Sequence, residues 1–590
     1  MSEGVPEQSQ RGDADRRFRQ YLTDDWARWM SEVPEVATIV GFPGFNDRWT
    51  DDSPEGIGAR RRHLEESAAG LAQHDPARLA PSERLNHRLY AQLLALARVG
   101  VGFGDDATPF HFGWPHSLRM PLNQMDGIHL TAGQLLPIQP KAHVADVEAI
   151  VARLRALPRA LEQNRALLEN GVKLGFVPPR EAIRGLPAQV AGLAPEDPKE
   201  SALLQALEEL PPTVPAADRD RLINEASAVY TREIRPAVHR LHRYLVDTYL
   251  PAARTTVGMS DLPNGRAMYD HHVRWTTTTD QTAEQIHAIG LAEVERIEAD
   301  MQALMHTVGF QGSLSEFRTF LRTDEQFHPA SADALIDGFR VIAKRIDPEL
   351  SKCFGLLPRL PYGVTPVPDF AAPSCPAAYY QSGATSTGRP GMFYANTYDL
   401  PSRPSWGMEA LTLHEAVPGH HLQIALAAEM EDVPEFRKHS GETAFVEGWG
   451  LYAESLGGEL GLYKDPYSRF GALTFDMWRS IRLVVDTGMH AFGWSRERAI
   501  QFFRDHTGMA ELDIAVEVDR YIVVPGQALA YKTGQLKFRE LRTFAEQTLG
   551  ERFDVRAFHD VLLAEGGVPL GEVDARVRAW VERQRAAAAA

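Results

Sequence analysis

The clearest regular pattern in the chain is an apolar spacing of three and four residues near its middle. Five apolar residues follow one another at gaps of 3, 4, 3 and 4, namely Val294, Ile297, Met301, Leu304 and Val308. This spacing places them on one face of an α-helix. Thr282 and Gln285 form a capping-box pattern upstream, and Gly309 is a suitable terminator. The pattern predicts a long amphipathic helix over about residues 282–309.

Most of the remaining chain also has the spacing of helices. Residues 146–171 predict a helix that is interrupted near Pro158 and stopped by Gly171. Residues 356–405 differ, because they are rich in Pro, Gly, Ser and Tyr, a composition typical of loops and short strands. Within them, "GMFYANTY" at 391–398 has the aromatic residues of a short strand. We therefore expect a mostly α fold with a small β-sheet.

The change of composition also suggests how the chain is divided. We expect residues 1–15 to be disordered, residues 16–375 to form an N-terminal helical region, and residues 376–585 to form a catalytic helical region. The terminal alanine run is expected to be disordered as well.

Charge and composition exclude several classes of partner and site. The net charge of −17 disfavours nucleic acid, because phosphate binding requires a basic surface. The start of the chain lacks the apolar run of a signal peptide, and no stretch of about eighteen apolar residues predicts a membrane span. We therefore expect a cytoplasmic protein without a membrane partner. Cys353 and Cys375 are too few for a disulfide framework or a thiolate zinc site.

One short segment carries residues that can bind a metal. "LTLHEAVPGHHLQ" at 411–423 contains His414, Glu415, His420 and His421. A helical His-Glu-x-x-His zinc site would have its second histidine four residues after the first, where this chain has Pro418. Catalytic zinc requires about three histidine or carboxylate ligands and an open position for water. His414 supplies a ligand, and Glu415 supplies a base that can deprotonate the water.

The second histidine must be His420 or His421, and neither suits a regular helix. Six residues turn about 600°, so that His414 and His420 would not share a face, whereas seven residues separate the α-carbons by about 10.5 Å along the axis. The helix must therefore be distorted. Pro418 cannot donate a backbone hydrogen bond and Gly419 permits unusual dihedral angles, so these residues are the expected place.

The third ligand is expected from "GETAFVEGWGLYAES" at 441–455. Glu447 has aromatic neighbours that indicate a buried helix, where an unpaired carboxylate is costly unless a cation binds it. Glu454, seven residues later on the same face, is a candidate to orient a ligand histidine. The structural alternative is that Glu447 pairs with an arginine and the histidines cap a helix.

Two further clusters hold candidates for substrate binding or for stabilising a developing oxyanion. Arg479, Arg482, Asp486 and His490 follow at spacings of three and four, which places them along one side of a helix. Their structural alternative is a salt-bridged helix that packs two lobes together. Tyr521 and Tyr531 flank a Pro-Gly break, and a tyrosine hydroxyl near zinc can donate to an oxyanion. The alternative for each tyrosine is a role in the core.

Taken in order, "LHEAVPGHHLQ", "FVEGWGLYAE", "RLVVDTGMH" and "VVPGQALAYKTGQ" resemble the bacterial family known as domain of unknown function 885. The similarity extends from about Arg17 to about Trp580. That family is grouped with the zincin metallopeptidases, and it resembles helical oligopeptidases such as thimet oligopeptidase and angiotensin-converting enzyme. Those enzymes use His-Glu-x-x-His and a downstream glutamate in a deep groove between two helical lobes.

The resemblance implies a two-lobed helical zincin-like fold, with the small sheet near a deep central groove. It implies His414 and Glu447 as ligands and Glu415 as the general base. Because "PGH" preserves the glycine that often precedes the second histidine of these peptidases, it favours His420 over His421. It also implies that residues 391–398 form an edge strand that pairs with a peptide substrate.

We therefore expect a zinc-dependent metallohydrolase, either carboxypeptidase-like or oligopeptidase-like, that acts on short peptides or amino-acid conjugates. In this interpretation Glu415 deprotonates zinc-bound water, and His490, Tyr521 or Tyr531 stabilises the oxyanion. Two alternatives stay open, namely hydrolysis or another metal-assisted reaction of a non-peptide amide, and a non-catalytic peptide-binding protein. The sequence leaves the oligomeric state open.

Overall fold

A computed structural model describes residues 4–110, 114–369, 372, 375–384, 388–439 and 441–589. Helices make up 69% of the structure, and the described strands form one small sheet, so the mostly helical fold class is confirmed. The chain forms two compact units, one of Met1–His271 with Pro434–His439, the other of His272–Val433 with Ser440–Ala590. Among the helices in the described ranges, none combines the length and apolar composition that a membrane crossing requires.

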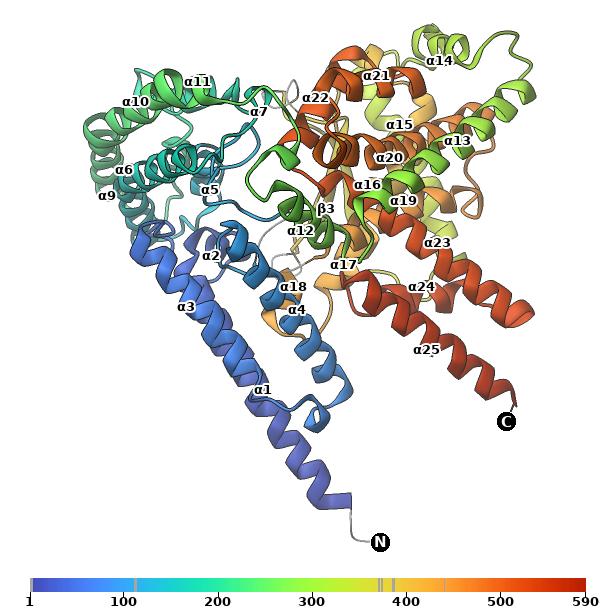
Figure 1. Cartoon of the computed structure of the whole chain (residues 1–590), viewed down its shortest axis with the longest axis horizontal. Coiled ribbons are helices and arrows are strands. Elements are labelled where there is room, and N and C mark those ends of the chain that lie inside the picture. The colour runs from blue at the N-terminus through green and yellow to red at the C-terminus, as the bar shows by residue number, and fades with distance from the viewer. Residues whose placement is uncertain are drawn as a thin grey trace. The chain divides into compact units, whose positions relative to one another are not determined.

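The first unit is built from helices (Figure 1). They are α1 (Gly4–Glu32), α2 (Pro34–Val40), α3 (Pro54–Leu71), α4 (Pro81–Phe103), α5 (Ile128–Ile138), α6 (Val144–Lys173), α7 (Arg180–Ile183), α8 (Leu186–Gly192), α9 (Ala216–Val229), α10 (Arg235–Tyr244), α11 (Leu250–Ala252) and α18 (Glu435–His439). The last of these is distant in sequence. It joins the unit because Phe436 packs against Tyr90, with 5.1 Å between ring centroids, and His439 stacks on Trp26.

Two expectations for this unit differ from the structure. Helix α6 continues through Pro158 and ends at Lys173, beyond Gly171. Leu154, Leu157 and Leu161 are fully buried around the proline, and this packing outweighs the backbone hydrogen bond that the proline cannot make. At the N-terminus, α1 begins at Gly4, within the segment expected to be disordered.

The second unit contains the remaining helices and the sheet. Helix α12 (Gly265–Thr277) crosses the boundary between the units. The others are α13 (Ala283–Thr307), α14 (Leu314–Thr323), α15 (Ala332–Ile346), α16 (Met408–Glu415), α17 (His420–Ala428), α19 (Thr443–Ser455), α20 (Pro466–Phe492), α21 (Arg496–His506), α22 (Glu511–Val523), α23 (Ala530–Leu549), α24 (Val555–Leu563) and α25 (Leu570–Ala589). The strands are β1 (Tyr362–Pro366), β2 (Ala378–Gln381) and β3 (Gly391–Ala395). Helix α25 thus includes most of the alanine run that was expected to be disordered.

Helix α13 is the amphipathic helix that the apolar spacing predicts, and it packs along α20 (Figure 1). Its capping box is confirmed, because the Thr282 hydroxyl accepts from the Gln285 amide and the Gln285 side chain accepts from the Thr282 amide. The two helices approach closely at Gly290, where a Cβ would lie 2.8 Å from the side chains of Leu483 and Val484. A glycine there allows the long helix to rest directly on α20.

The packing of α13 and α15 explains why the division of the chain differs from the predicted boundary at 375/376. Helix α13 lies against α20, and α15 contacts both α16 and β1. Residues 272–375 therefore share a core with the helices that carry the histidines, and the boundary lies at 271/272. Such long-range packing leaves no mark on local composition.

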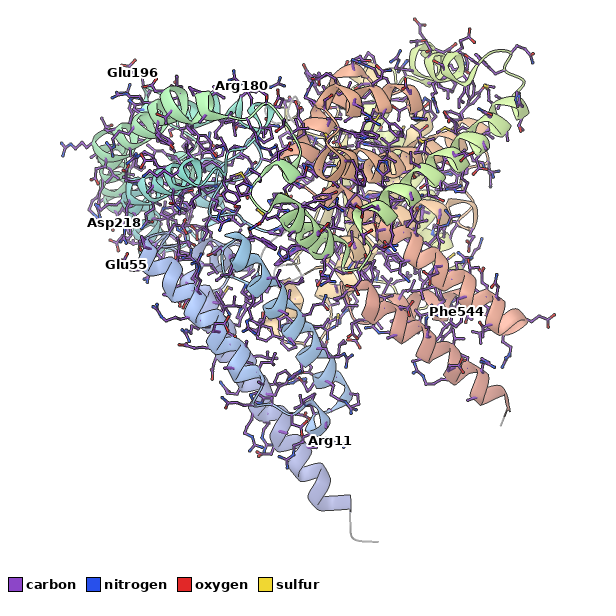
Figure 2. The ribbon with its side chains drawn as sticks, in the orientation of Figure 1. Arg11, Glu55, Arg180, Glu196, Asp218 and Phe544 are labelled. Carbon is purple, nitrogen blue, oxygen red and sulfur yellow. The ribbon has the colours of Figure 1, made fainter. Side chains whose placement is uncertain are left out.

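Helices α19 and α23 pack face to face in the second unit. A Cβ on Gly448 would lie 2.4 Å from the α-carbon of Gly534, and one on Gly534 would lie 1.9 Å from the carbonyl oxygen of Ala444. Only a pair of glycines permits backbones to come this close. Helix α23 also packs against α25. The guanidinium of Arg578 in α25 lies 4.6 Å from the ring centroid of Phe544 in α23, which is labelled in Figure 2.

The three strands are ordered β1-β3-β2, with β1 parallel and β2 antiparallel to β3. The expectation that residues 391–398 form an edge strand is wrong, because β3 has a partner strand on each side. Phe393 of this central strand is fully buried against Phe339 of α15, with 5.0 Å between ring centroids. The two flanking strands come from Pro- and Gly-rich sequence, which hides their tendency to pair.

Candidate metal centre

The segment between His414 and His420 interrupts the helix, as the spacing of the histidines requires. Helix α16 ends at Glu415, α17 begins at His420, and residues 416–419 form the connection. Gly419 is necessary there, because a Cβ would lie 1.9 Å from the carbonyl oxygen of His414. The indole of Trp449 donates a hydrogen bond of 2.8 Å to the carbonyl of Pro418. The predicted distortion at Pro418 and Gly419 is thus confirmed as a complete break.

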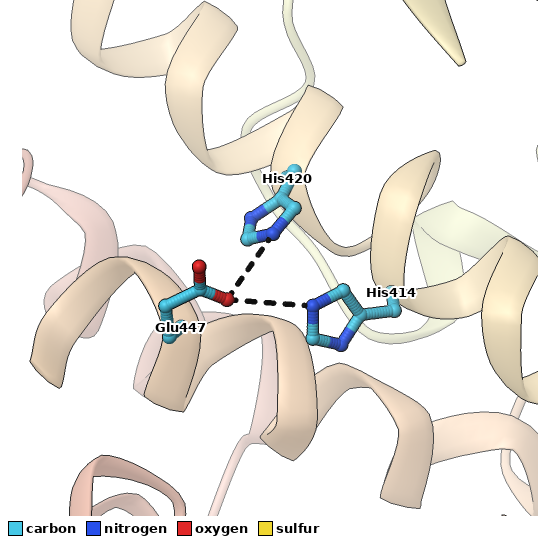
Figure 3. A group of neighbouring side chains, drawn as sticks. All are labelled: His414, His420 and Glu447. Atoms are coloured by element: carbon cyan, nitrogen blue, oxygen red, sulfur yellow. Dashed lines mark ion pairs between the residues drawn. The ribbon is translucent and has the colours of Figure 1, made fainter. Parts of the chain in front are cut away.

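The break allows His414 and His420 to point toward one place, and Glu447 of α19 points toward the same place (Figure 3). One ligand atom each from His414, His420 and Glu447 lies within 4.8 Å of the other two. Oε2 of Glu447 lies 3.5 Å from Nε2 of each histidine. The centroids of the two imidazole rings are 4.7 Å apart, and the rings are nearly perpendicular.

These distances fit a zinc ion. Zinc lies about 2.1 Å from histidine nitrogen and carboxylate oxygen, and tetrahedral geometry then separates two ligand atoms by about 3.4 Å. The distances from the Glu447 oxygen to the two nitrogens match this value. Two imidazoles and one carboxylate also form a usual ligand set of a catalytic zinc, with a fourth position left for water.

A second glutamate holds His414 from the other side of its ring. Oε1 of Glu454 lies 2.8 Å from Nδ1 of His414, so Nδ1 donates and Nε2 is left to face Glu447. Nη2 of Arg479 lies 3.6 Å from the same Glu454 oxygen. Gly450 leaves room for the ring, since a Cβ there would lie 2.8 to 3.1 Å from three of its atoms. This hydrogen bond sets the tautomer and orientation that a metal ligand needs.

The charges of the centre favour a cation. Burial alone would lower the pKa of His414, but the carboxylates of Glu447 and Glu454 raise it to about 9. Burial would likewise raise the pKa of Glu447, but His414 and His420 hold it well below its usual value. An arrangement that holds a proton this strongly also attracts a divalent metal ion, which would replace that proton.

His421 faces away from the other two histidines. Its Nε2 lies 3.0 Å from the carbonyl of Leu360, and its Nδ1 lies 2.9 Å from the hydroxyl of Tyr380 in β2. Burial lowers the pKa of His421 to about 4, which fits a neutral ring that donates to the carbonyl and accepts from the hydroxyl. Both ring nitrogens are occupied, so the geometry selects His420 as the partner of His414.

Glu415 lies at the end of α16, directly after the first histidine. It is only 8% exposed, and its carboxylate forms no hydrogen bond or ion pair with the part of the chain that the structure describes. The negative charge of Glu415 contributes to the raised pKa of His414, so Glu415 lies near the candidate metal centre. A nearly buried carboxylate with no protein partner is costly unless water or a ligand contacts it.

Only one of the three predicted oxyanion residues has a free hydrogen-bond donor. Nε2 of His490 lies 3.0 Å from the carbonyl of Tyr521, and the Tyr521 hydroxyl accepts from Arg482 and donates to Glu517. Tyr531 is different, because its hydroxyl accepts a long 3.5 Å bond from Gln527 and donates to no described residue. Burial, and then the charge of Glu447, raise the pKa of Tyr531.

Asp486, which belongs to the same predicted cluster as His490, has a structural role. Asp486 accepts from the backbone amide of Gly526 at 3.1 Å and so holds the turn before α23. Glu517, Arg520 and Gln527 contact the same tyrosines but were not predicted from the sequence. The spacing of four residues between Glu517 and Tyr521 is the one sequence signal that could have revealed them.

We expect Glu454→Gln to lower zinc affinity by about 10- to 100-fold, because partners that orient a ligand histidine have effects of this size. Affinity is measured by competition with a chelator of known zinc affinity. Glu459→Gln is the matched control, since Glu459 is exposed and pairs with Arg542. Equal zinc affinity in the two variants would exclude an orienting role for Glu454.

Comparison with known proteins identifies relatives along nearly the whole chain. A family described as "Bacterial protein of unknown function (DUF885)" matches residues 34–577. A crystal structure described as that of "the putative lipoprotein from Colwellia psychrerythraea" is 25% identical, covers 97% of this chain and 99% of its own, and has a TM-score of 0.86. Another solved structure, described as that of "a putative lipoprotein of unknown function from Shewanella oneidensis", is 17% identical, covers 94% of this chain and 98% of its own, and has a TM-score of 0.75. A search among curated proteins finds no match.

Proposed function

The chain belongs to the DUF885 family of bacterial proteins, and from its candidate metal centre we propose that it is a zinc-dependent hydrolase of amide bonds. Short peptides and amino-acid conjugates are the proposed substrates. The observation that carries the proposal is the convergence of His414, His420 and Glu447 beside the unpaired carboxylate of Glu415. A relationship to the helical zincin metallopeptidases is part of the same proposal.

His414, His420 and Glu447 would hold the ion, and Glu454 would keep His414 in the required tautomer. A bound zinc ion supplies Lewis acidity, which polarises a carbonyl and lowers the pKa of water. Glu415 accepts a proton from the attacking water while the oxygen of that water bonds to the amide carbon. Glu415 then returns the proton to the leaving nitrogen as the carbon–nitrogen bond breaks, which yields an acid and an amine.

Tyr531 is the residue that we assign to stabilise the charge that develops on the amide oxygen. Its hydroxyl donates to no described residue. Tyr531 lies at the start of α23, one helical turn before Gly534, and the contact between Gly534 and Gly448 holds α23 against α19, the helix that carries Glu447. Donors aimed at such an oxygen stabilise the transition state more than the substrate.

We expect Tyr531→Phe to lower kcat by about 10²- to 10³-fold, the usual effect of removing one oxyanion donor. The matched variant is Tyr521→Phe, whose hydroxyl is occupied within the protein and whose loss is expected to affect thermal stability more than kcat. Steady-state kinetics and thermal unfolding of both variants test the assignment. Equal effects on kcat would remove the special role of Tyr531.

The function is tested with the zinc-loaded full chain and a degenerate library of short peptides and acyl amino acids. Mass spectrometry identifies new amines and carboxylates. We expect amide cleavage that stops when a chelator removes the metal and resumes when zinc is restored. If the zinc-loaded protein cleaves no member of the library, the hydrolase proposal fails, and retention of peptides without cleavage would indicate a binding protein.

A further inference from the structure

A second charged cluster, which the proposed mechanism does not use, lies on α20 and α22 beside Tyr531. We call it the arginine cluster, and it consists of Arg482, Glu517, Arg520, Tyr521 and Gln527. Nη2 of Arg482 and Nη2 of Arg520 lie 3.2 and 3.0 Å from Oε2 of Glu517. The hydroxyl of Tyr521 donates to the same oxygen at 2.5 Å, and Arg520 donates to Gln527 at 2.7 Å.

The arginine cluster carries one more positive than negative charge. Its two guanidinium groups face a single carboxylate. Burial would raise the pKa of Glu517, but Arg520 and Arg482 lower it to about 2, so this carboxylate remains charged. Burial raises the pKa of Tyr521, which therefore remains neutral. An excess charge with little access to water is unfavourable unless an anion comes to it.

Arg482 retains an unused donor. Its Nε donates to Tyr521 and its Nη2 to Glu517, but its Nη1 is buried and has no hydrogen-bond partner in the described part of the chain. The guanidinium lies 4.5 Å from the ring centroid of Tyr531 and 4.7 Å from that of Trp478. This stacking holds the group in a fixed orientation. Such a group loses little freedom when it binds an anion.

The arginine cluster is partly exposed to solvent at Arg520 and Glu517, and at Arg482 it contacts Tyr531, which lies toward the candidate metal centre. The side chains of Arg520 and Glu517 are 19% and 18% exposed, compared with 5% for Arg482. Tyr531 connects the two sites. Its ring lies 4.5 Å from the Arg482 guanidinium, and it precedes by one helical turn Gly534, whose backbone packs against Gly448, the neighbour of Glu447. A substrate whose amide lies at the candidate metal centre would therefore carry its neighbouring groups toward the arginines.

Building on the proposed function, we propose that the arginine cluster binds a carboxylate of the substrate and thereby selects peptides or acyl amino acids that carry one near the scissile amide. A planar guanidinium matches a planar carboxylate and binds it through charge-assisted hydrogen bonds. Two sources of this group are available in such substrates, the C-terminal carboxylate and the side chain of Asp or Glu. Arg520 and Arg482 are then specificity residues rather than parts of the hydrolytic machinery.

Two degenerate tripeptide libraries test the inference, one of free acids and one of C-terminal amides, each incubated with the zinc-loaded full chain. Mass spectrometry gives cleavage rates for each member. We expect preferred members to be cleaved about 10- to 150-fold faster than matched members without the carboxylate, the usual worth of a hydrogen bond to a charged group. A preference for the acid library identifies the C-terminal carboxylate as the source. Amides that are cleaved only when they contain Asp or Glu identify the side chain.

Variants then connect the preference to the cluster. Arg520→Gln is expected to remove most of the preference through a rise in KM for the carboxylate-bearing members, whereas Arg520→Lys retains part of it. Arg504→Gln is the control, because Arg504 pairs with Glu511 at an exposed position. Zinc content and thermal unfolding identify a misfolded variant, and the wild-type comparison of the two libraries decides the inference without any variant.

The possible failures are distinct. Cleavage that does not depend on any carboxylate overturns the inference and leaves the hydrolase proposal intact. A preference that Arg520→Gln retains in full, with normal zinc content, also overturns the inference. Absence of cleavage in both libraries overturns the proposed function, and the inference falls with it.

Discussion

Wild-type protein is expected to bind about one zinc ion per chain, and His414→Ala, His420→Ala and Glu447→Ala are each expected to lose it. Each substitution removes one of the three atoms that converge within 4.8 Å. Loss of an orienting partner lowers metal affinity by about 10- to 100-fold, and loss of a direct ligand should lower zinc affinity by more than that. Elemental mass spectrometry of the purified variants measures the metal content.

His421→Ala provides the decisive control, because His421 is adjacent to His420 in the sequence. Its ring nitrogens contact Leu360 and Tyr380 rather than the candidate metal centre, so this variant should retain zinc. It is expected to unfold at a lower temperature, since it loses one hydrogen bond to Tyr380 in β2 and one to the carbonyl of Leu360, which precedes β1. Loss of zinc in His421→Ala together with its retention in His420→Ala would reverse the assignment of the second ligand. A wild-type protein that cannot be loaded with any divalent metal would refute the site.

Glu415→Gln is expected to leave zinc bound and to lower turnover by about 10²- to 10⁴-fold, the usual contribution of a general base. The amide occupies the same volume as the carboxylate but cannot accept a proton from water. Because Glu415 has no hydrogen-bond partner in the described structure, its replacement breaks no hydrogen bond within the protein, and stability should change little. Steady-state kinetics on a substrate from the library experiment, with zinc content measured in parallel, separates catalysis from metal binding.

Glu409→Gln is a suitable comparison on the same helix. Glu409 accepts a hydrogen bond from the backbone amide of Tyr463 and forms an ion pair with Arg345. We expect this variant to lose stability and to keep most of its turnover. Equal activity of Glu415→Gln and wild type, with zinc bound in both, would eliminate Glu415 as the base and with it the proposed mechanism.

The local features of the fold could be predicted from the sequence because neighbouring residues determine them. The capping box of α13 and the break between His414 and His420 depend on residue types within a few positions. The apolar face of α13 is only partly as predicted, since Leu304 is half-buried and Met305 is buried in its place. Alternating gaps of three and four average 3.5 residues, whereas an α-helix has 3.6 residues per turn, so the predicted stripe drifts away from the buried face along the helix.

The features that could not be predicted depend on residues distant in the chain. The roles of Tyr521 and Tyr531 are distinguished by Glu517 and Arg482, which occupy the hydroxyl of the first and leave that of the second free. His490 carried the same signal as a catalytic histidine, but its ring contacts the carbonyl of Tyr521 in the core. Polar residues that satisfy one another and polar residues that await a ligand look alike in a sequence.

The connection at residues 416–419 has a consequence for recognising related chains. In an uninterrupted helix the number of residues between two ligand histidines is set by the helical repeat, and only a spacing of four suits one metal. Here the two ligand histidines belong to separate helices. The connecting turn can therefore differ in length among related chains while the second helix still begins at a ligand histidine. A search pattern with fixed spacing will therefore miss chains of this kind. A better criterion is His-Glu at the end of one helix, a histidine at the start of the next, and a glutamate on a third helix that contacts both.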